Sequence, residues 1–220
     1  MARILGLDEA GRGSVLGPLV VGGFLVDEER LSELVETGAT DSKALDPKTR
    51  ERIVAVLPTL GECDTVVLPP REIDQYVSLG RLNDLEARAF GTLVSRLHPD
   101  EVHADACDTD PHRFGRMIAK SCGPTRARIL AHHHADRDDP IVGAASIVAK
   151  VRRDAAIRRL SQQLGVDVGS GYPSDPRTIQ FLQVRLAAEH GCPAWARASW
   201  STMQRVIPER PARTLDAYES

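Results

Sequence analysis

Four acidic residues follow predicted strands, and together they could hydrolyse a phosphodiester. Asp8 and Glu9 end one predicted strand, Asp105 ends another, and Asp136 follows a third strand and precedes a long helix. Because sites in open sheets form where strands end, these carboxylates can meet in space. Clustered carboxylates raise one another's pKa, and divalent cations relieve that repulsion. Oxygen ligands favour Mg²⁺ or Mn²⁺, and two such ions can clamp the attacking and leaving oxygens of hydrolysis.

Each acid also has a structural interpretation, which position alone leaves open. The chain contains 31 acidic residues, and most acids of a globular protein are solvated. A single acid at a strand end is structural more often than catalytic. Asp138 lies two positions beyond Asp136 and stays the reserve candidate for the fourth acid.

The elements that must position these acids are strands first and then alternating helices and strands. Apolar, β-branched runs bounded by turn residues predict strands at 3–8, 18–26, 65–68, 101–105 and 127–131. Helical spacing predicts helices from Pro47, from an Asn83 cap, and over 111–119, 140–163 and 175–190. This order indicates an α/β fold with one mixed sheet and helices on its faces.

Composition and charge exclude several classes of protein. A chain of 220 residues with 42% hydrophobic and 27% charged residues is typical of one large globular domain. It has no apolar run of about 18 residues, and acids follow its first residues closely, so we expect a cytoplasmic protein without a membrane partner. Its four cysteines form no C-x-x-C pair, so zinc is not expected. A net charge of −3 argues against a non-specific DNA coat protein.

Five sequence blocks resemble the signatures of type 2 ribonucleases H (ribonuclease HII). They are DEAGRG at 8–13, DSKAL at 41–45, ADA at 104–106, AASIVAKV at 144–151 after Asp136, and GSGYPSDP at 169–176. One block alone would be weak evidence, but five in the family's order are specific. The extent of the chain looks most like the compact single-chain members.

This resemblance implies a ribonuclease H-like fold, with a five-stranded mixed sheet flanked by helices and a C-terminal helical part. It implies a catalytic domain at 1–165 and a C-terminal helical, substrate-binding part of the same unit at 166–220. It also implies metal-dependent cleavage of RNA in RNA–DNA hybrids, and nicking 5′ of ribonucleotides in duplex DNA that leaves 5′-phosphate and 3′-hydroxyl ends. The acids that match the family's metal-binding and catalytic positions are Asp8, Glu9, Asp105 and Asp136.

The resemblance assigns substrate contacts to six further residues. Gly11, Arg12 and Gly13 match the loop that reads the 2′-hydroxyl, the group that separates RNA from DNA. Glycines suit this role because no Cβ keeps the backbone from the sugar. Tyr172 matches a tyrosine that packs against the sugar of the next nucleotide. Ser42 and Lys43, just before a helix, suit phosphate binding.

Several other features have simpler interpretations. His132, His133 and His134 invite a metal interpretation, but neighbours on a strand face opposite ways, so we expect a surface cluster. Core packing is the expected role of Trp195 and Trp200. Lys150 and Arg153 share a helix face and could contact phosphate or the acids.

Two alternatives to the ribonuclease remain open at this point. A DNA nuclease or recombinase on the same fold would use the same acids, but it would have no 2′-hydroxyl to read. A non-catalytic nucleic-acid-binding module would gain nothing from clustered negative charge beside phosphates. We expect a monomer, and the sequence shows no motif for a protein partner.

Overall fold

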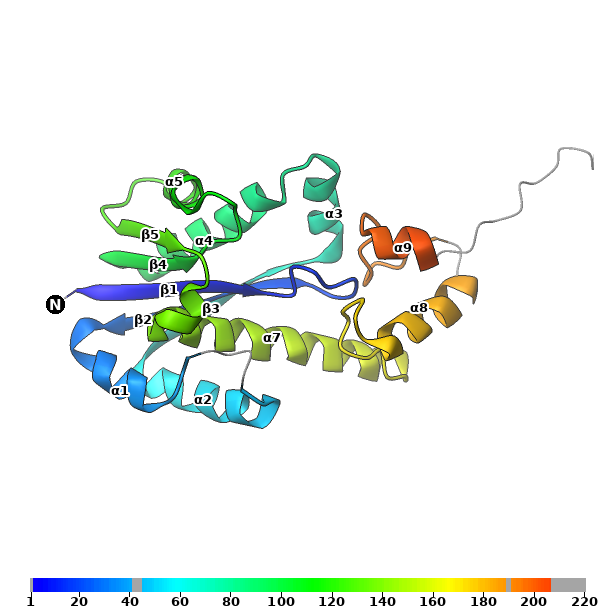
Figure 1. Ribbon diagram of the computed structural model, residues 1–220, viewed down its shortest axis with the longest axis horizontal. Helices are drawn as coiled ribbons and strands as arrows, with labels where there is room; N and C mark the ends of the chain where they lie inside the picture. The colour runs from blue at the N-terminus through cyan, green and yellow to red at the C-terminus, as the bar shows by residue number, and fades with distance from the viewer. Residues whose placement is uncertain (1, 41–44, 189–190, 207–220) are drawn as a thin grey trace, which may run out of the picture.

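A five-stranded mixed sheet forms the centre of the computed structural model, which describes residues 2–40, 45–188 and 191–206 (Figure 1). The strands are β1 (Arg3–Ala10), β2 (Leu19–Asp27), β3 (Gly61–Leu68), β4 (Glu101–Asp105) and β5 (Arg128–His132). The helices are a 3-10 turn η1 (Glu28–Arg30), α1 (Leu31–Glu36), α2 (Pro47–Leu60), α3 (Pro70–Ser78), α4 (Leu82–Leu97), α5 (Pro111–Ser121), α6 (Ala135–Asp138), α7 (Pro140–Leu164), α8 (Pro176–Ala188) and α9 (Ser201–Val206).

The order of the strands brings the ends of three of them to one edge. The sheet runs β3-β2-β1-β4-β5, with β2 antiparallel to β1 and to β3. β4 is parallel to β1 and to β5, and its Ala104 pairs with both Leu7 and Ala131. The carboxyl ends of β1, β4 and β5 therefore lie side by side, which is where a site is expected.

Helices cover both faces of the sheet (Figure 1). On one face, Leu5 and Leu7 of β1 belong to a buried cluster with residues of α4 and α5, including Phe90 and Phe114. On the other face, buried residues of β1 and β2 pack with α2 and with the first half of α7. Alternate residues of β1 thus face two cores, which makes it the central strand.

The long helix α7 lies directly against the sheet. Its first residue is Pro140, and the Asp139 side chain caps it by accepting from the Ile141 amide at 2.9 Å. A Cβ at Gly22 of β2 would lie 2.4 Å from the Ala145 carbonyl oxygen of α7. Glycine at this position is what lets the helix backbone approach the strand.

The C-terminal part packs on the far half of α7. A third buried cluster joins Ile157 and Leu160 of α7 to Leu182 of α8 and Met203 of α9. Val15 and Leu16, which follow β1, belong to the same cluster. This third core therefore ties the C-terminal helices to the loop that leaves β1.

The predicted fold class and the five predicted strands are confirmed, with differences at the boundaries. β1 continues two residues past Asp8, and β3 begins at Gly61 instead of residue 65. Helices α1, α3, α6 and α9 were not predicted. No helix among the described residues has the length and apolar character to cross a membrane.

The predicted Asn83 cap is wrong. Helix α4 begins at Leu82, and its N-cap residue is Arg81, which makes no side-chain cap bond. The side chain of Asn83 instead accepts from Arg12 Nη2 at 2.6 Å and donates to Asp108 at 2.9 Å. Tertiary contacts with Arg12 and Asp108 therefore replace the local cap that the sequence suggested.

Candidate active site

Two of the predicted acids lie near the carboxyl end of β1, where water has little access. The residue Asp8 is 3% exposed, and burial raises the pKa of its carboxyl group to about 6. Lys150 and a hydrogen bond from Ser146, both on α7, act against this rise. The pKa of Glu9 is raised well above its usual range by burial and by the charges of Asp8, Glu86 and Asp105. Both acids therefore hold protons more tightly than solvated carboxyl groups do.

The other two predicted acids come from β4 and α6. Asp105 is the last residue of β4, and its Oδ1 accepts from the Ala135 amide at 3.0 Å. That bond fixes the strand end against the residue just before Asp136. Asp136 is 1% exposed, whereas Asp138, the reserve candidate, lies on the surface. Burial thus favours Asp136 as the fourth acid.

This set of carboxylates fits hard divalent cations by its chemistry. Asp105 is close enough for its charge to raise the pKa of both Asp8 and Glu9. Glu9 Oε2 is buried with no hydrogen-bond partner among the described residues. Carboxylate oxygens are the ligands that Mg²⁺ and Mn²⁺ prefer. Within the described part of the chain, however, no three His, Cys, Asp or Glu side chains are grouped tightly enough to hold an ion as they stand. A cation would therefore draw these side chains closer together.

The residues Gly11, Arg12 and Gly13, here called the glycine loop, follow these acids directly. Gly11 has a φ of +90°, and a Cβ there would lie 2.9 Å from the Pro18 carbonyl oxygen. Gly13 is exposed, and a Cβ there would meet nothing within 4 Å. The loop thus has one constrained end and one open end beside the acids.

Glu86 is a residue of this site that the sequence interpretation missed. Its carboxylate, 0% exposed on α4, accepts from Arg12 Nε at 2.8 Å and from the Cys107 thiol at 3.1 Å. The signal was present, because Glu86 lies four residues before Phe90, on the buried side of a strongly apolar helix. An acid in such a position needs a partner, and here the partner is Arg12.

Arg153 connects Tyr172 to Ser14, the residue directly after the glycine loop. The Arg153 guanidinium stacks over the Tyr172 ring at 4.3 Å, and its Nη2 donates to Ser14 Oγ at 2.8 Å and to the Ser170 carbonyl at 2.6 Å. The amide of Val15 donates to the Gly171 carbonyl at 2.9 Å. Lys150 and Arg153 therefore act at different places, since Lys150 lies beside Asp8 and Arg153 supports the Tyr172 loop.

The remaining predicted residues fall into three groups. Ser42 and Lys43 lie outside the described residues. His132 ends β5 and His133 and His134 lie in a turn; all three are exposed, as expected for a surface cluster. Trp195 and Trp200 are half-buried against the third core, as expected.

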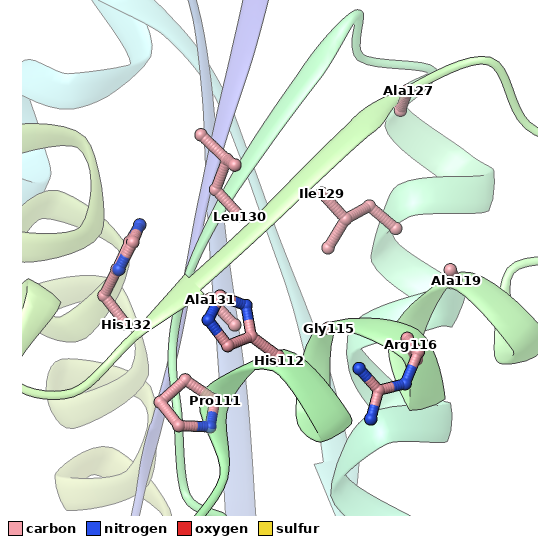
Figure 2. Close-up of a pocket in the computed structure, with 10 residues that line it drawn as sticks. All are labelled: Pro111, His112, Gly115, Arg116, Ala119, Ala127, Ile129, Leu130, Ala131 and His132. Carbon is pink, nitrogen blue, oxygen red and sulfur yellow. The ribbon is translucent and has the colours of Figure 1, made fainter.

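The cavity between β5 and α5 is separate from these acids. It has a volume of about 330 Å³ and is lined by apolar residues together with His112, Arg116 and His132 (Figure 2). None of the four candidate acids lines it. The candidate site is instead the edge where β1 and β4 end. A five-stranded mixed sheet with carboxyl groups at neighbouring strand ends is the arrangement of a nuclease of the ribonuclease H-like class.

Comparison with known proteins identifies the family. The model of the family described as Ribonuclease HII matches residues 5–203. The chain belongs to the ribonuclease HII family and is an endoribonuclease that acts on RNA–DNA hybrids; the family depends on divalent metal ions. The ribonuclease HII of Methanocella arvoryzae is 46% identical over 220 residues, which cover 99% of this chain and 97% of that protein.

Solved structures agree with this assignment. The ribonuclease H2 of Pyrococcus horikoshii matches with a TM-score of 0.85 at 38% identity, covering 93% of this chain and 97% of that one. Bst-RNase HIII, solved in complex with Mn²⁺, matches with a TM-score of 0.78 at 18% identity and covers 94% of this chain and 69% of that one. The second likeness shows that the fold is shared.

Proposed function

We propose that this endonuclease cuts 5′ of a ribonucleotide, either within a hybrid or embedded singly in duplex DNA. Cleavage there leaves a 5′-phosphate and a 3′-hydroxyl end. The observation that carries the proposal is that the acids at the ends of β1 and β4, among them the buried Asp8, lie directly beside the open glycine loop. A site for hydrolysis and a site for reading the sugar then share one edge of the sheet.

In this proposal Asp8, Glu9, Asp105 and Asp136 hold Mg²⁺ or Mn²⁺. The ions would activate a water molecule and stabilise the charge that develops on the leaving oxygen. The residues of the chain supply the rest: burial keeps bulk water out, and Lys150 beside Asp8 limits the build-up of negative charge. The Mn²⁺ complex of Bst-RNase HIII supports an ion of this kind.

The glycine loop reads the 2′-hydroxyl in this proposal. Gly13 is exposed and its Cβ side is open, so backbone groups can approach a ribose there. Tyr172 packs against the sugar of the next nucleotide, with Arg153 stacked on its ring to fix the orientation. Ser42 and Lys43, which lie outside the described residues, bind phosphate.

We also propose that residues 1–165 form the catalytic domain and that 166–220 form a substrate-binding part of the same unit. The bonds between the segments that follow β1 and those near Gly171 support this division of labour within one body. The protein acts as a monomer in the cytoplasm and requires no membrane.

The test is cleavage of a DNA duplex that contains one ribonucleotide, with an all-DNA duplex and a long hybrid alongside. We expect a nick 5′ of the ribonucleotide with Mg²⁺ or Mn²⁺ and none with a chelator, and we expect Asp105→Asn to abolish it. Labelled ends distinguish a 5′-phosphate product from other products.

Two other outcomes would count against this proposal. Cutting of the all-DNA duplex would favour a DNA nuclease with the same acids. Binding without cutting of any duplex, with either metal, would favour a non-catalytic module.

A further inference from the structure

Arg197 is a fully buried cation that hydrogen-bonds to the backbone of the glycine loop. Its exposed fraction is 0%. It lies in the C-terminal part of the chain, outside every motif of the sequence. Its Nη1 donates to the carbonyl oxygen of Arg12 at 2.9 Å, and its Nε donates to that of Gly17 at 3.2 Å. One guanidinium thus fixes a backbone carbonyl within the loop and a second carbonyl four residues after the loop.

The surroundings of Arg197 keep it in place and charged. The guanidinium lies 4.9 Å from the centroid of the Trp200 ring, a stacking distance for a cation on an aromatic face. Burial, together with the nearby charge of Arg153, lowers the pKa of Arg197 to about 10, so it keeps its proton at neutral pH. A buried charge is costly unless its bonds are needed, and those bonds go to the loop.

The backbone of the C-terminal part joins the same loop. The Arg197 amide donates to the Val15 carbonyl at 3.0 Å, and the Gly17 amide donates to the Trp195 carbonyl at 2.8 Å. An isolated antiparallel bridge pairs Leu16 with Ala196. The segment that carries Arg197 therefore cannot shift without moving the residues after the glycine loop.

Residue 12 is consequently held at two points. Its side chain is bound by Glu86 and Asn83 of α4, and its carbonyl oxygen is bound by Arg197. The next residue, Gly13, is exposed and open on its Cβ side. The orientation of the peptide between residues 12 and 13 therefore depends on the bond from Arg197.

We propose that Arg197 is a positioning residue that sets the preference for ribose by orienting the backbone of the glycine loop. It does not touch the substrate itself. The inference rests on the proposed function, in which this loop reads the 2′-hydroxyl. A hydrogen bond from the loop to that hydroxyl needs the backbone within a few tenths of an ångström of its position, so loss of the Arg197 bonds weakens ribose recognition before general binding.

The experiment measures binding in the non-cleaving Asp105→Asn background, so that chemistry does not interfere. Dissociation constants are obtained for a duplex with one ribonucleotide and for the all-DNA duplex. Arg197→Met removes both donors, and Arg197→Lys keeps the charge but lacks the fork that reaches two carbonyls. Arg205→Met is the matched control, because Arg205 is an exposed arginine of α9 whose guanidinium bonds to Thr202 instead of the loop.

We expect the parent and Arg205→Met to prefer the ribonucleotide duplex by roughly tenfold, the effect of one good hydrogen bond. Arg197→Met should bring this ratio close to one while its affinity for all-DNA duplex stays within about twofold, and Arg197→Lys should give an intermediate ratio. A purely structural role of Arg197 would weaken the binding of both duplexes equally and leave the ratio unchanged.

If folded Arg197→Met preferred the ribonucleotide duplex as strongly as the parent does, the inference would be overturned. If Arg197→Met does not fold, a preference in Arg197→Lys equal to that of the parent would overturn it as well. No ribose preference in the parent, by contrast, would contradict the proposed role of the glycine loop and not the role of Arg197 alone.

Discussion

Asp8 and Glu9 place two carboxyl groups where little water reaches them. Burial raises the pKa of both. The charge of Asp105 adds to the rise for Asp8, and the charges of Asp8, Glu86 and Asp105 add to the rise for Glu9. Such an arrangement lowers the stability of the metal-free fold at neutral pH, because a buried carboxylate is less well solvated than in the unfolded chain. The acids are thus better explained by the cation they hold than by any contribution to folding.

Glu9→Gln should therefore stabilise the metal-free protein while it abolishes cleavage. The substitution removes a buried charge that repels Asp8 and Asp105, at similar volume. A gain of about 1 kcal/mol corresponds to a rise of roughly 2–4 °C in the melting temperature for a chain of this size. Thermal denaturation in chelator measures it, with the exposed Asp138→Asn as control; a clear fall in the melting temperature of Glu9→Gln would contradict the explanation.

The stabilisation by Mg²⁺ should depend on pH in a definite direction. The folded-state pKa of Asp8 is raised from 3.8 to about 6, so its favourable contribution is complete below 3.8 and is lost as the pH rises through about 6. A cation binds the deprotonated form and restores the lost stability. The increase in melting temperature on adding Mg²⁺ should thus be larger near pH 8 than near pH 5. Equal increases at both pH values would show that these carboxyl groups do not bind the ion.

The elements show which signals in a sequence are reliable. Strands β1, β2, β4 and β5 follow from apolar runs bounded by turns, and α7 follows from its period and its Asp139-Pro140 start. Helix α3 is not apparent from the sequence because Pro69 and Pro70 indicate the end of a strand, although Pro70 is also the first residue of a helix. The first half of β3 is not apparent from the sequence because it is an edge strand with two acids, the exposed Glu62 and Asp64, which is bound by Arg96 of α4.

At the scale of the loop, the two glycines should respond differently to substitution. Gly11→Ala forces a side chain onto a φ of +90° and against the Pro18 carbonyl, so we expect a loss of about 1–3 kcal/mol in the free energy of unfolding. Gly13→Ala meets no atom within 4 Å, so its stability should stay within about 0.5 kcal/mol of the parent. Its added methyl group lies where the ribose should approach, so its cleavage rate should fall roughly tenfold or more.

Denaturant unfolding and single-turnover cleavage of both variants provide the check. The informative variant is Gly13→Ala, because its fold should be intact. Full activity of this variant on a ribonucleotide duplex would mean that the sugar does not approach the loop from this side.

At the scale of the whole molecule, contacts distant in sequence complete the site. The fold class and the four acids could be predicted, because strand ends and motifs are local in the sequence. The partners of Glu86 and Arg197 could not, since they lie 74 residues away for Glu86 and 185 residues away for Arg197. Helical spacing indicates that Glu86 is buried but does not identify its partner, so only the packed structure shows that both residues bind the same loop.

The C-terminal part illustrates this dependence on tertiary structure. From the sequence it is a helix followed by a segment with two tryptophans. In the structure Asp74 of α3 accepts from the amides of Ala198 and Ser199, at 2.9 Å and 3.0 Å, while Arg197 reaches the glycine loop. The segment thus bridges α3 and the loop after β1, which a linear pattern does not indicate.

The central claim is that four acids at adjacent strand ends, two of them fully buried, hold the divalent ions needed for cleavage. The most direct measurement compares Asp8→Asn, Glu9→Gln, Asp105→Asn and Asp136→Asn with Asp138→Asn, the exposed acid on the same short helix as Asp136. For each protein, Mg²⁺ or Mn²⁺ binding by calorimetry is measured beside single-turnover cleavage of a duplex with one ribonucleotide. We predict that the four variants lose ion affinity and more than about a hundredfold in rate, while Asp138→Asn keeps both. Normal ion binding and cleavage in Asp105→Asn or Asp136→Asn, or loss of both in Asp138→Asn, would contradict this assignment of the site.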